Sequence, residues 1–342
     1  MLQTAMAALQ AQDFAAAADG FEAALAAMPN HPGILRSLVM LRSRLGEHGK
    51  ALAHAEAALA LVGQDAMLQD QRLAAMARLG RAEEALGLSQ TQAQSLPNAA
   101  FRQGDCLLLL QRPAEALERF EAALRHEPGR QEPARPEILT AAAEAAYRCG
   151  KLQTARGWLD QAVALEPNNR TTVMARATIL LSLGPGDPTA WHQGLLDYEA
   201  RLWPEDSLHI ERRLNLPRWQ GEPLDGGAMA GTGGHLLVCA EQGIGDQIRF
   251  ATALPALLAR GIRITFECAE RLVPLLARNW PQIAVHAAQE KRLGRQHVFF
   301  YDWLNHNGAD RPQSYIEGGS LALRLYEMGT RPDGQTRKVM AK

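Results

Sequence analysis

The stretch FAAAADGFEAALAAMP at residues 14–29 decides the fold of the first half of the chain. It places an aromatic residue, Phe14, at its start, small residues at Ala17 and Ala24, and a proline, Pro29, at its end. Small side chains let two helices approach closely, and a proline cannot continue a helix because it lacks the backbone N–H. The stretch is therefore predicted to be the second helix of a helical hairpin.

The pattern recurs along the first half of the chain. Ala17, Ala51 and Ala85 are 34 residues apart, and Ala116 and Ala155 follow at spacings of 31 and 39. In three units a glycine closes the first helix five residues before the small residue: Gly46, Gly80 and Gly150. This period resembles the tetratricopeptide repeat, whose helical hairpins stack into a superhelix. We expect five repeats over 1–169, with an insertion around 131–137, in preference to a long helical bundle.

A degenerate repeat with capping helices is predicted over 170–214, because a terminal repeat must cover its exposed apolar face. Its aromatic residues Trp191, Tyr198 and Trp203 are interpreted as packing residues, with a ligand cage as the alternative. The following segment, 215–234, is rich in Gly and Pro and is predicted to be a linker.

Beyond this linker the pattern changes to alternating strands and helices. Strands are expected at 235–240, 262–267, 283–287 and 297–301, and helices at 246–260 and 270–279, each with a proline that should kink or shorten it. Such alternation predicts a parallel sheet of the Rossmann type over 235–326, followed by a polar tail at 327–342. The predicted fold class is thus an α-solenoid followed by a single Rossmann-like α/β domain.

The turn Glu241-Gln242-Gly243-Ile244-Gly245 connects the first of these strands to a helix opened by Asp246. Two glycines permit a sharp turn, and an acidic residue at the carboxyl edge of a strand lies where open α/β sheets bind substrates. Asp246 is also well placed to cap the helix. The two roles are compatible.

The order of segments over 215–325 resembles bacterial repeat proteins with a heptosyltransferase-like glycosyltransferase domain of the GT-B class. The resemblance implies that Asp246 is the general base that deprotonates an acceptor hydroxyl. It also implies that the acceptor pocket is lined by four residues of the turn: Glu241, Gln242, Gly243 and Gly245. Only about 110 to 130 residues follow the linker, enough for one Rossmann domain and not for the donor-binding second one.

Two hypotheses stay open. The chain is either the acceptor-binding half of a glycosyltransferase, with a glycan or protein acceptor, or a non-catalytic scaffold that binds a peptide in the repeat groove. Whether the chain is an enzyme is therefore undecided. Aligning the repeats places Arg44, Arg78 and Arg148 at one position late in the first helix, with Arg36 about one turn earlier. They are predicted to form a basic track for an acidic partner, with solvated arginines as the alternative.

Composition excludes several classes. With 342 residues, 47% hydrophobic and 21% charged, and a formal net charge of −1, the chain is expected to be a globular protein that does not bind nucleic acid. The four cysteines have no metal-ligand spacing and are expected to be buried thiols. A third glycine is absent at Ile248, so NAD binding is rejected. No metal, no cofactor, no membrane span and a cytoplasmic location are expected.

Overall fold

The computed structural model describes residues 2–96, 98–125, 135–203, 209–224, 234–293, 296–306 and 311–329. Contacts divide the chain into two compact units, Met1–Leu183 and Gly184–Lys342, which we call unit 1 and unit 2. The division lies within the segment 170–214 that the sequence assigns to capping helices.

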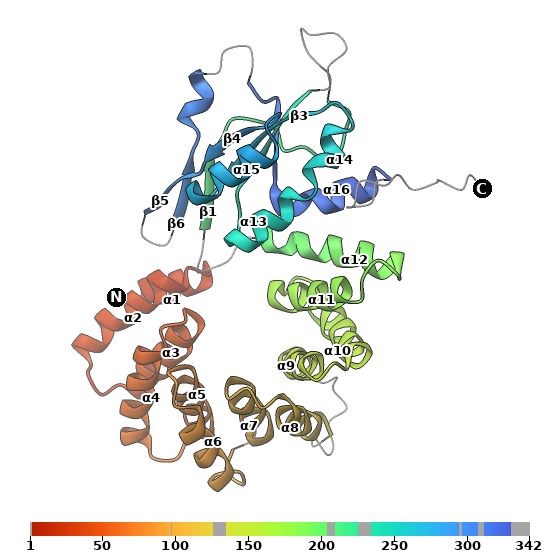
Figure 1. Ribbon diagram of the computed structural model, residues 1–342. Coiled ribbons are helices and arrows are strands. Elements are labelled where there is room, and N and C mark those ends of the chain that lie inside the picture. The colour runs from red at the N-terminus through yellow and green to blue at the C-terminus, as the bar shows by residue number, and fades with distance from the viewer. Residues whose placement is uncertain are drawn as a thin grey trace. The chain divides into compact units, whose positions relative to one another are not determined.

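Unit 1 is a row of helical hairpins. The first helices of the hairpins are α1 (Leu2–Gln10), α3 (Pro32–Arg44), α5 (Ala66–Arg78), α7 (Ala99–Leu109) and α9 (Pro136–Arg148), and α11 (Arg170–Ser182) continues the row. The second helices are α2 (Phe14–Ala27), α4 (His48–Val62), α6 (Ala82–Thr91), α8 (Pro113–Arg125) and α10 (Leu152–Leu165). Figure 1 shows the first helices along the inside of an arc and the second helices along its outside.

The alanines of the repeat pattern lie at the contacts between these helices. Ala17, Ala51, Ala85, Ala116 and Ala155 are each at most 1% exposed. A methyl group at each contact allows the side-chain ridges of one helix to fit the grooves of the next at a short interaxial distance. The tetratricopeptide solenoid predicted from the period is confirmed.

Gly104 marks the closest approach between α7 and α8. A Cβ atom at this position would lie 2.6 Å from Cε1 of Phe120, whose side chain is fully buried. Any larger residue would have to displace this ring or the helix that bears it. Position 104 therefore requires glycine for packing and not for backbone conformation.

The turn inside each hairpin uses a residue with positive φ. These residues are Gln12, Gly46, Gly80, Gln111, Gly150 and Gly184. The left-handed conformation closes the first helix and redirects the chain, and glycine adopts it without the steric cost that a Cβ atom brings. Two of the six turns nevertheless use glutamine.

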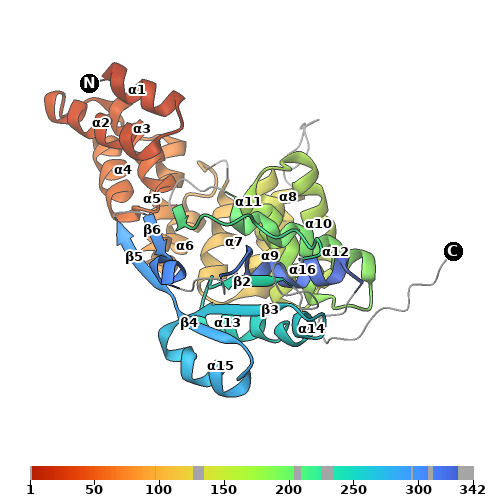
Figure 2. The same cartoon turned by 90° about the horizontal axis from the view of Figure 1, so that it is seen from above.

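Unit 2 contains a parallel four-stranded sheet with the order β4-β3-β2-β7. Its strands are β2 (His235–Cys239), β3 (Arg263–Cys268), β4 (Ala284–Ala287) and β7 (Ser314–Glu317), and each neighbouring pair is parallel. All five residues of β2 are buried, as expected for a strand covered on both faces. Figure 2 shows α13 (Ile244–Ala251), α14 (Leu254–Leu258) and α15 (Val273–Asn279) on one side of β2 and β3.

A second sheet has the order β1-β6-β5, with β1 (His209–Arg213), β5 (Gln289–Leu293) and β6 (Gln296–Phe300). β1 pairs with β6 in parallel, and β5 pairs with β6 antiparallel. The strand expected at 297–301 therefore exists as β6, but its assignment to the same sheet as 235–240 was wrong. Only two residues separate β5 from β6 in the sequence, too few for a parallel crossover, and the two strands pair antiparallel.

The helix expected at 246–260 is divided into α13 and α14. Pro255 lies in the first turn of α14 and Pro274 in the first turn of α15, where a missing N–H is tolerated. The two prolines therefore start helices and do not kink them.

Part of the segment predicted as a linker is packed into unit 2. The Trp219 side chain is fully buried, and its Nε1 donates a hydrogen bond of 2.7 Å to the carbonyl oxygen of Glu222. Arg218 forms a parallel β-bridge with Tyr315. A large aromatic side chain gains most when it is removed from water, which explains why a Gly- and Pro-rich stretch packs here. Residues 225–233 and most of the predicted tail, 330–342, lie outside the described residues.

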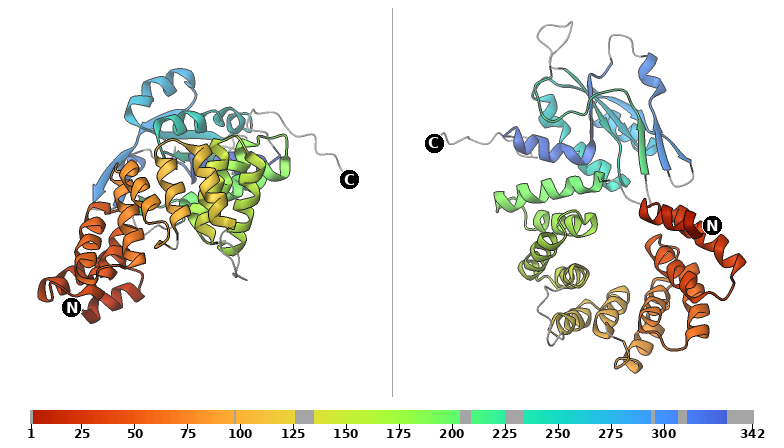
Figure 3. Two further views of the ribbon diagram at one scale, coloured as in Figure 1. Left: turned by 90° about the horizontal axis from the view of Figure 1, so that it is seen from below. Right: turned by 180° about the vertical axis from the view of Figure 1, so that it is seen from behind.

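The remaining helices of unit 2 are α12 (Pro188–Tyr198), η1 (Glu199–Leu202), η2 (Glu270–Leu272), η3 (Asp302–His306), η4 (Gly318–Ser320) and α16 (Leu321–Glu327). Figure 3 shows α12 beside α16. The Tyr326 hydroxyl donates a hydrogen bond of 2.9 Å to the carbonyl oxygen of Pro188, and its ring stacks on His192 at 5.0 Å between centroids. The helix predicted to cap the repeats thus packs against the last described helix of unit 2.

Candidate functional site

The first helices of the hairpins in unit 1 form a groove with two adjoining cavities. The larger cavity, of about 560 Å³, is lined by residues of α3, α5, α7 and α9 together with Asn98 and Arg135, which immediately precede α7 and α9. The smaller, of about 350 Å³, is lined by residues of α1, α3 and α5. Met40 and Met67 line both, so the cavities form one continuous surface.

The smaller cavity is mainly apolar. It is lined by Leu9, Met40, Leu41 and Met67, together with Gly33, Arg36 and Ser37. The Met40 side chain is 48% exposed and that of Leu9 is 39% exposed. Methionine side chains adapt their shape to an incoming apolar group, which makes this part of the groove suited to a peptide side chain.

The larger cavity adds charged and polar side chains to this apolar floor. Asp70 and Arg102 form a buried ion pair, with Arg102 Nη2 at 2.7 Å from Asp70 Oδ2. Arg135 Nη2 donates a hydrogen bond of 2.7 Å to Asn98 Oδ1. Phe101 lies between Asn98 and Arg102 in the sequence and lines the same cavity. The groove can therefore contact both apolar and polar groups of a ligand.

Of the four arginines predicted to line the groove, Arg36 lines the smaller cavity, where it forms an ion pair with Asp65. The other three lie at the C-terminal ends of their helices and do not line the two cavities. The guanidinium of Arg44 lies 3.9 Å from the Phe14 ring centroid. Arg78 pairs with Asp105 at 2.9 Å, and Arg148 pairs with Glu144 at 2.6 Å. The basic track stays a prediction. Each of its four arginines already contacts a carboxylate or an aromatic ring of the same chain.

The turn predicted as an acceptor site lies in unit 2 between β2 and α13. Its left-handed residue is Gln242, with φ of 58°, whereas neither Gly243 nor Gly245 has a positive φ. The expectation that the glycines permit the turn was therefore wrong. Gly243 occupies the N-cap of α13 and has no side chain to cap the helix.

Asp246 lies in the first turn of α13 and not at its N-cap, so its expected capping role was also wrong. Its Oδ1 accepts a hydrogen bond of 3.0 Å from Arg249 Nη2. A carboxylate at this position is still stabilised by the partial positive charge of the helix N-terminus. The side chain is 37% exposed.

Glu241 is buried in an ion-pair network. Arg201 holds its carboxylate with two hydrogen bonds, 2.9 Å from Nη2 and 3.1 Å from Nε, and Gly319 N donates a third. The Ser320 hydroxyl accepts from Arg201 at 2.7 Å and donates to Glu199 at 2.7 Å. Because its carboxylate oxygens accept three hydrogen bonds, Glu241 stabilises the fold of unit 2 and is not presented to a ligand.

The network continues to Arg218, which donates to Glu199 at 2.9 Å and to Glu317 at 2.7 Å. Burial alone would raise the pKa of Glu199. The charge of Arg201 and the hydrogen bonds from Arg201, Ser320 and Arg218 outweigh burial and lower it. The network therefore connects η1 to the ends of β2 and β7 through paired charges. The sequence signals none of it, because its members are far apart along the chain.

A second buried polar cluster lies at the carboxyl end of β3. Glu267 is fully buried, and its Oε2 accepts hydrogen bonds from Ala240 N at 2.9 Å and from the Tyr301 hydroxyl at 3.2 Å. Arg212 of β1 donates to the same hydroxyl at 2.7 Å. Burial raises the pKa of Glu267 despite the charge of Arg212. A fully buried carboxyl group cannot reach a ligand, so this cluster connects the two sheets.

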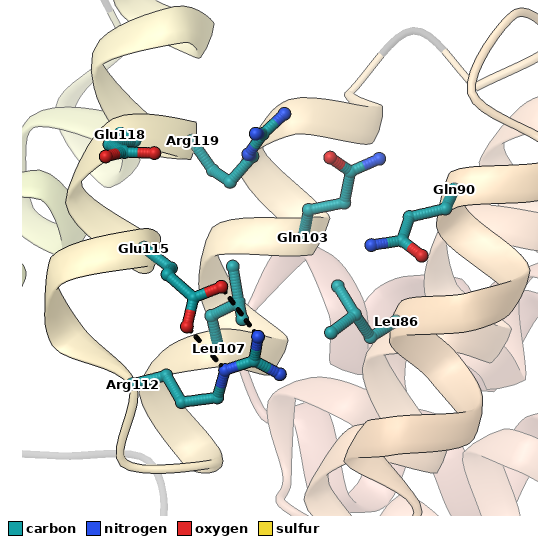
Figure 4. Close-up of a pocket in the computed structure, with 8 residues that line it drawn as sticks. All are labelled: Leu86, Gln90, Gln103, Leu107, Arg112, Glu115, Glu118 and Arg119. Atoms are coloured by element: carbon teal, nitrogen blue, oxygen red, sulfur yellow. Dashed lines mark hydrogen bonds and ion pairs between the residues drawn. The ribbon is translucent and has the colours of Figure 1, made fainter.

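Figure 4 shows a further pocket, of about 270 Å³, between α6, α7 and α8. Arg112 and Glu115 at its edge form two parallel hydrogen bonds of 2.7 and 2.6 Å. Both side chains are well exposed, at 42% and 53%, and an exposed pair of this kind contributes little to stability or binding. This pocket lacks the apolar floor of the groove.

Within the described ranges, no group of three His, Cys, Asp or Glu side chains is placed to hold a metal ion. None of the described helices combines the length and the hydrophobicity needed to cross a lipid bilayer.

Comparisons with known proteins do not identify a partner or an activity. No protein-family model matches the chain. Protein FlbA of Caulobacter vibrioides is 28% identical over 314 residues, which cover 85% of this chain and 48% of that protein. The chain thus spans about half the length of this curated relative.

Two solved structures are similar to part of the chain. A tetratricopeptide-repeat protein of Thermus thermophilus is 23% identical with a TM-score of 0.44, over 53% of this chain and 97% of that one. One chain of the APC/C hetero-tetramer Cut9–Hcn1 is 16% identical with a TM-score of 0.49, over 58% of this chain and 39% of that one. The assignment of the repeat fold rests on the hairpins described above.

Proposed function

We propose that the chain is a protein–protein interaction scaffold whose unit 1 binds an extended segment of a partner protein in its groove. The two adjoining cavities that share Met40 and Met67 are the observation that supports this function. Full burial of one apolar side chain contributes about 1.5–3 kcal/mol, so two or three anchors give a useful affinity. Exposed apolar side chains in a concave surface are a common feature of binding sites.

The test uses a random peptide library displayed on phage and selected on the full chain. We expect the affinity of a selected peptide to fall at least tenfold in Met40→Glu and in Met67→Glu, because a carboxylate would be placed in the apolar cavity. Leu61→Glu is the matched control, since Leu61 is 45% exposed on α4, a helix on the outside of the arc. Peptides that bind both groove variants as tightly as the parent would exclude this function.

Glycosyl transfer is the second candidate, and neither the comparisons nor the geometry of the turn supports it. The role of Asp246 as a general base and of Glu241, Gln242, Gly243 and Gly245 as acceptor-site residues stays a prediction from the resemblance. Calorimetric titration with nucleotide sugars such as UDP-glucose tests it. Micromolar binding that is lost in Asp246→Ala would favour the enzyme over the scaffold.

A further inference from the structure

Arg135 is a groove residue whose charge is not balanced within the described chain. It lines the larger cavity and immediately precedes α9. Its Nη2 donates to the neutral amide oxygen of Asn98 at 2.7 Å, and its Nε is buried without a hydrogen-bond partner. A guanidinium has five N–H donors, and within the described residues this group has one hydrogen bond to a protein acceptor.

Unlike Arg135, other arginines of the groove region form ion pairs with carboxylates of the chain. Arg36 pairs with Asp65, Arg78 with Asp105, and Arg102 with Asp70. Arg135 forms no ion pair with a carboxylate of the described residues, although Glu137 lines the same cavity. A positive charge that is partly desolvated and unpaired is stabilised when an anion arrives.

We infer that Arg135 binds the side-chain carboxylate of an Asp or Glu in the partner segment, while Met40 and Met67 bind an apolar side chain of the same segment. This inference rests on the proposed function and names the chemistry of the partner. It differs from the basic track predicted from the sequence, because Arg135 is not one of the aligned arginines.

The distance between the contact at Met67 and the contact at Arg135 follows from the packing distance of neighbouring first helices. Met67 is on α5 and Arg135 precedes α9, two helices further along the inside of the arc. Neighbouring helices pack about 10 Å apart, so the two contacts are roughly 20 Å apart. An extended chain advances about 3.3 Å per residue, so the acidic residue should lie about six residues from the apolar anchor.

The carboxylate belongs to a side chain and not to a peptide C-terminus, because the row of helices does not end at Arg135. Helix α11 continues it. A bound segment can therefore extend beyond this contact in both directions.

The experiment selects peptides from a phage library in which each peptide is fused through its C-terminus and has no free terminal carboxylate. We expect selected peptides to contain an Asp or Glu about six residues from an apolar residue, as the extended spacing requires. Arg135→Met, which retains an unbranched apolar side chain, should weaken such a peptide at least tenfold at low salt. Changing the acidic residue of the peptide to its amide should weaken binding to the parent protein by a similar factor. Because the two changes remove one contact, combining them should cause little further loss.

Arg112→Met is the matched control, since Arg112 is an arginine of unit 1 that pairs with Glu115 outside the two cavities. It should leave the affinity unchanged. Peptides that lose affinity in Met40→Glu but bind Arg135→Met as tightly as the parent would exclude the Arg135 contact and leave the proposed function intact. An equal loss in Arg112→Met would indicate unspecific attraction and would also exclude the Arg135 contact. If Arg135→Met fails to fold, the amide variant of the peptide tests the same contact on the parent protein.

Discussion

Arg102 on α7 and Asp70 on α5 form a bidentate ion pair, 2.7 Å from Nη2 to Oδ2 and 3.1 Å from Nε to Oδ1. Both residues are at most 8% exposed. Arg102 also donates to Asp105 at 3.2 Å, and Asp105 accepts from Arg78 at 2.9 Å. Four alternating charges therefore connect the third and fourth hairpins beneath the groove.

Breaking this pair should destabilise unit 1 strongly. We expect Arg102→Met to lower the free energy of unfolding by about 3–5 kcal/mol, because Asp70 would be left as a buried, unpaired charge. The double variant Asp70→Leu/Arg102→Met should lose less than the sum of the single variants. Urea unfolding followed by far-UV circular dichroism measures both effects. Arg112→Met breaks the exposed pair with Glu115 and should cost at most about 1 kcal/mol. An Arg102→Met loss as small as this would show that the buried pair contributes little.

Two glycines in helices of unit 1 should respond to alanine in opposite directions. Gly104→Ala places a Cβ atom 2.6 Å from the Phe120 ring, and we expect it to destabilise by about 1–3 kcal/mol. Gly87 in α6 has no atom within 4 Å of the same position, so Gly87→Ala should stabilise by about 0.5–1 kcal/mol through helix propensity. The same unfolding experiment compares them. Equal effects of the two substitutions would contradict the close approach of α7 and α8.

The stability of unit 2 should fall in acid because of Glu199. Its pKa in the folded state is below the ordinary value of 4.5, so its contribution is complete at neutral pH and is lost as the pH falls through the lowered folded-state value. We expect Glu199→Gln to flatten the fall in stability below pH 4.5, and Glu270→Gln, at an exposed position in unit 2, to leave it unchanged. Tryptophan fluorescence is the appropriate probe, since Trp158 is the single tryptophan of unit 1 and the other five are in unit 2. If the stability of Glu199→Gln fell below pH 4.5 as steeply as that of the parent, the contribution of Glu199 to the acid sensitivity of unit 2 would be excluded.

Most thiols of the folded chain should react slowly. Burial raises the pKa of Cys106 to about 11, that of Cys239 to about 12 and that of Cys268 to about 11, so few thiolates form at neutral pH. Cys149 is only partly buried. We expect iodoacetamide to modify Cys149 first and all four cysteines after denaturation, as measured by mass spectrometry. Rapid modification of Cys239 in the native protein would show that unit 2 opens readily.

Sequence reasoning predicted the repeat array because its determinants are local. An alanine at each contact and a left-handed residue at each turn recur every 31 to 39 residues, and each acts within its own hairpin. The strands β2, β3 and β4 likewise begin and end within one residue of the ranges expected from the sequence. The second sheet escaped prediction because β5, QEKRL, is exposed at every position and shows no apolar alternation.

The contacts of the candidate sites were harder to predict, since they join residues far apart in the sequence. Arg201 and Glu241 are 40 residues apart, and no periodic pattern connects them. Arg135 lies within the predicted insertion at 131–137 and falls outside the repeat alignment, so only the structure shows its place in the groove. At the turn, glycine was taken as the flexible residue, whereas Gln242 has the positive φ. Composition alone cannot show which residue of a turn has this conformation.

The left-handed residues give the turns after the first helices a common backbone conformation. A Cβ atom built on the glycines at these turns would have no atom within 4 Å, and glutamine takes the same conformation at Gln12 and Gln111. The direction in which the chain leaves each first helix is thus set by the left-handed residue of the turn and not by contacts with surrounding residues. The segment between two such turns consists of the second helix of one hairpin and the first helix of the next. Inserted at another of these turns, it would leave the turn in the same direction, so recombination at these points would change the length of the array.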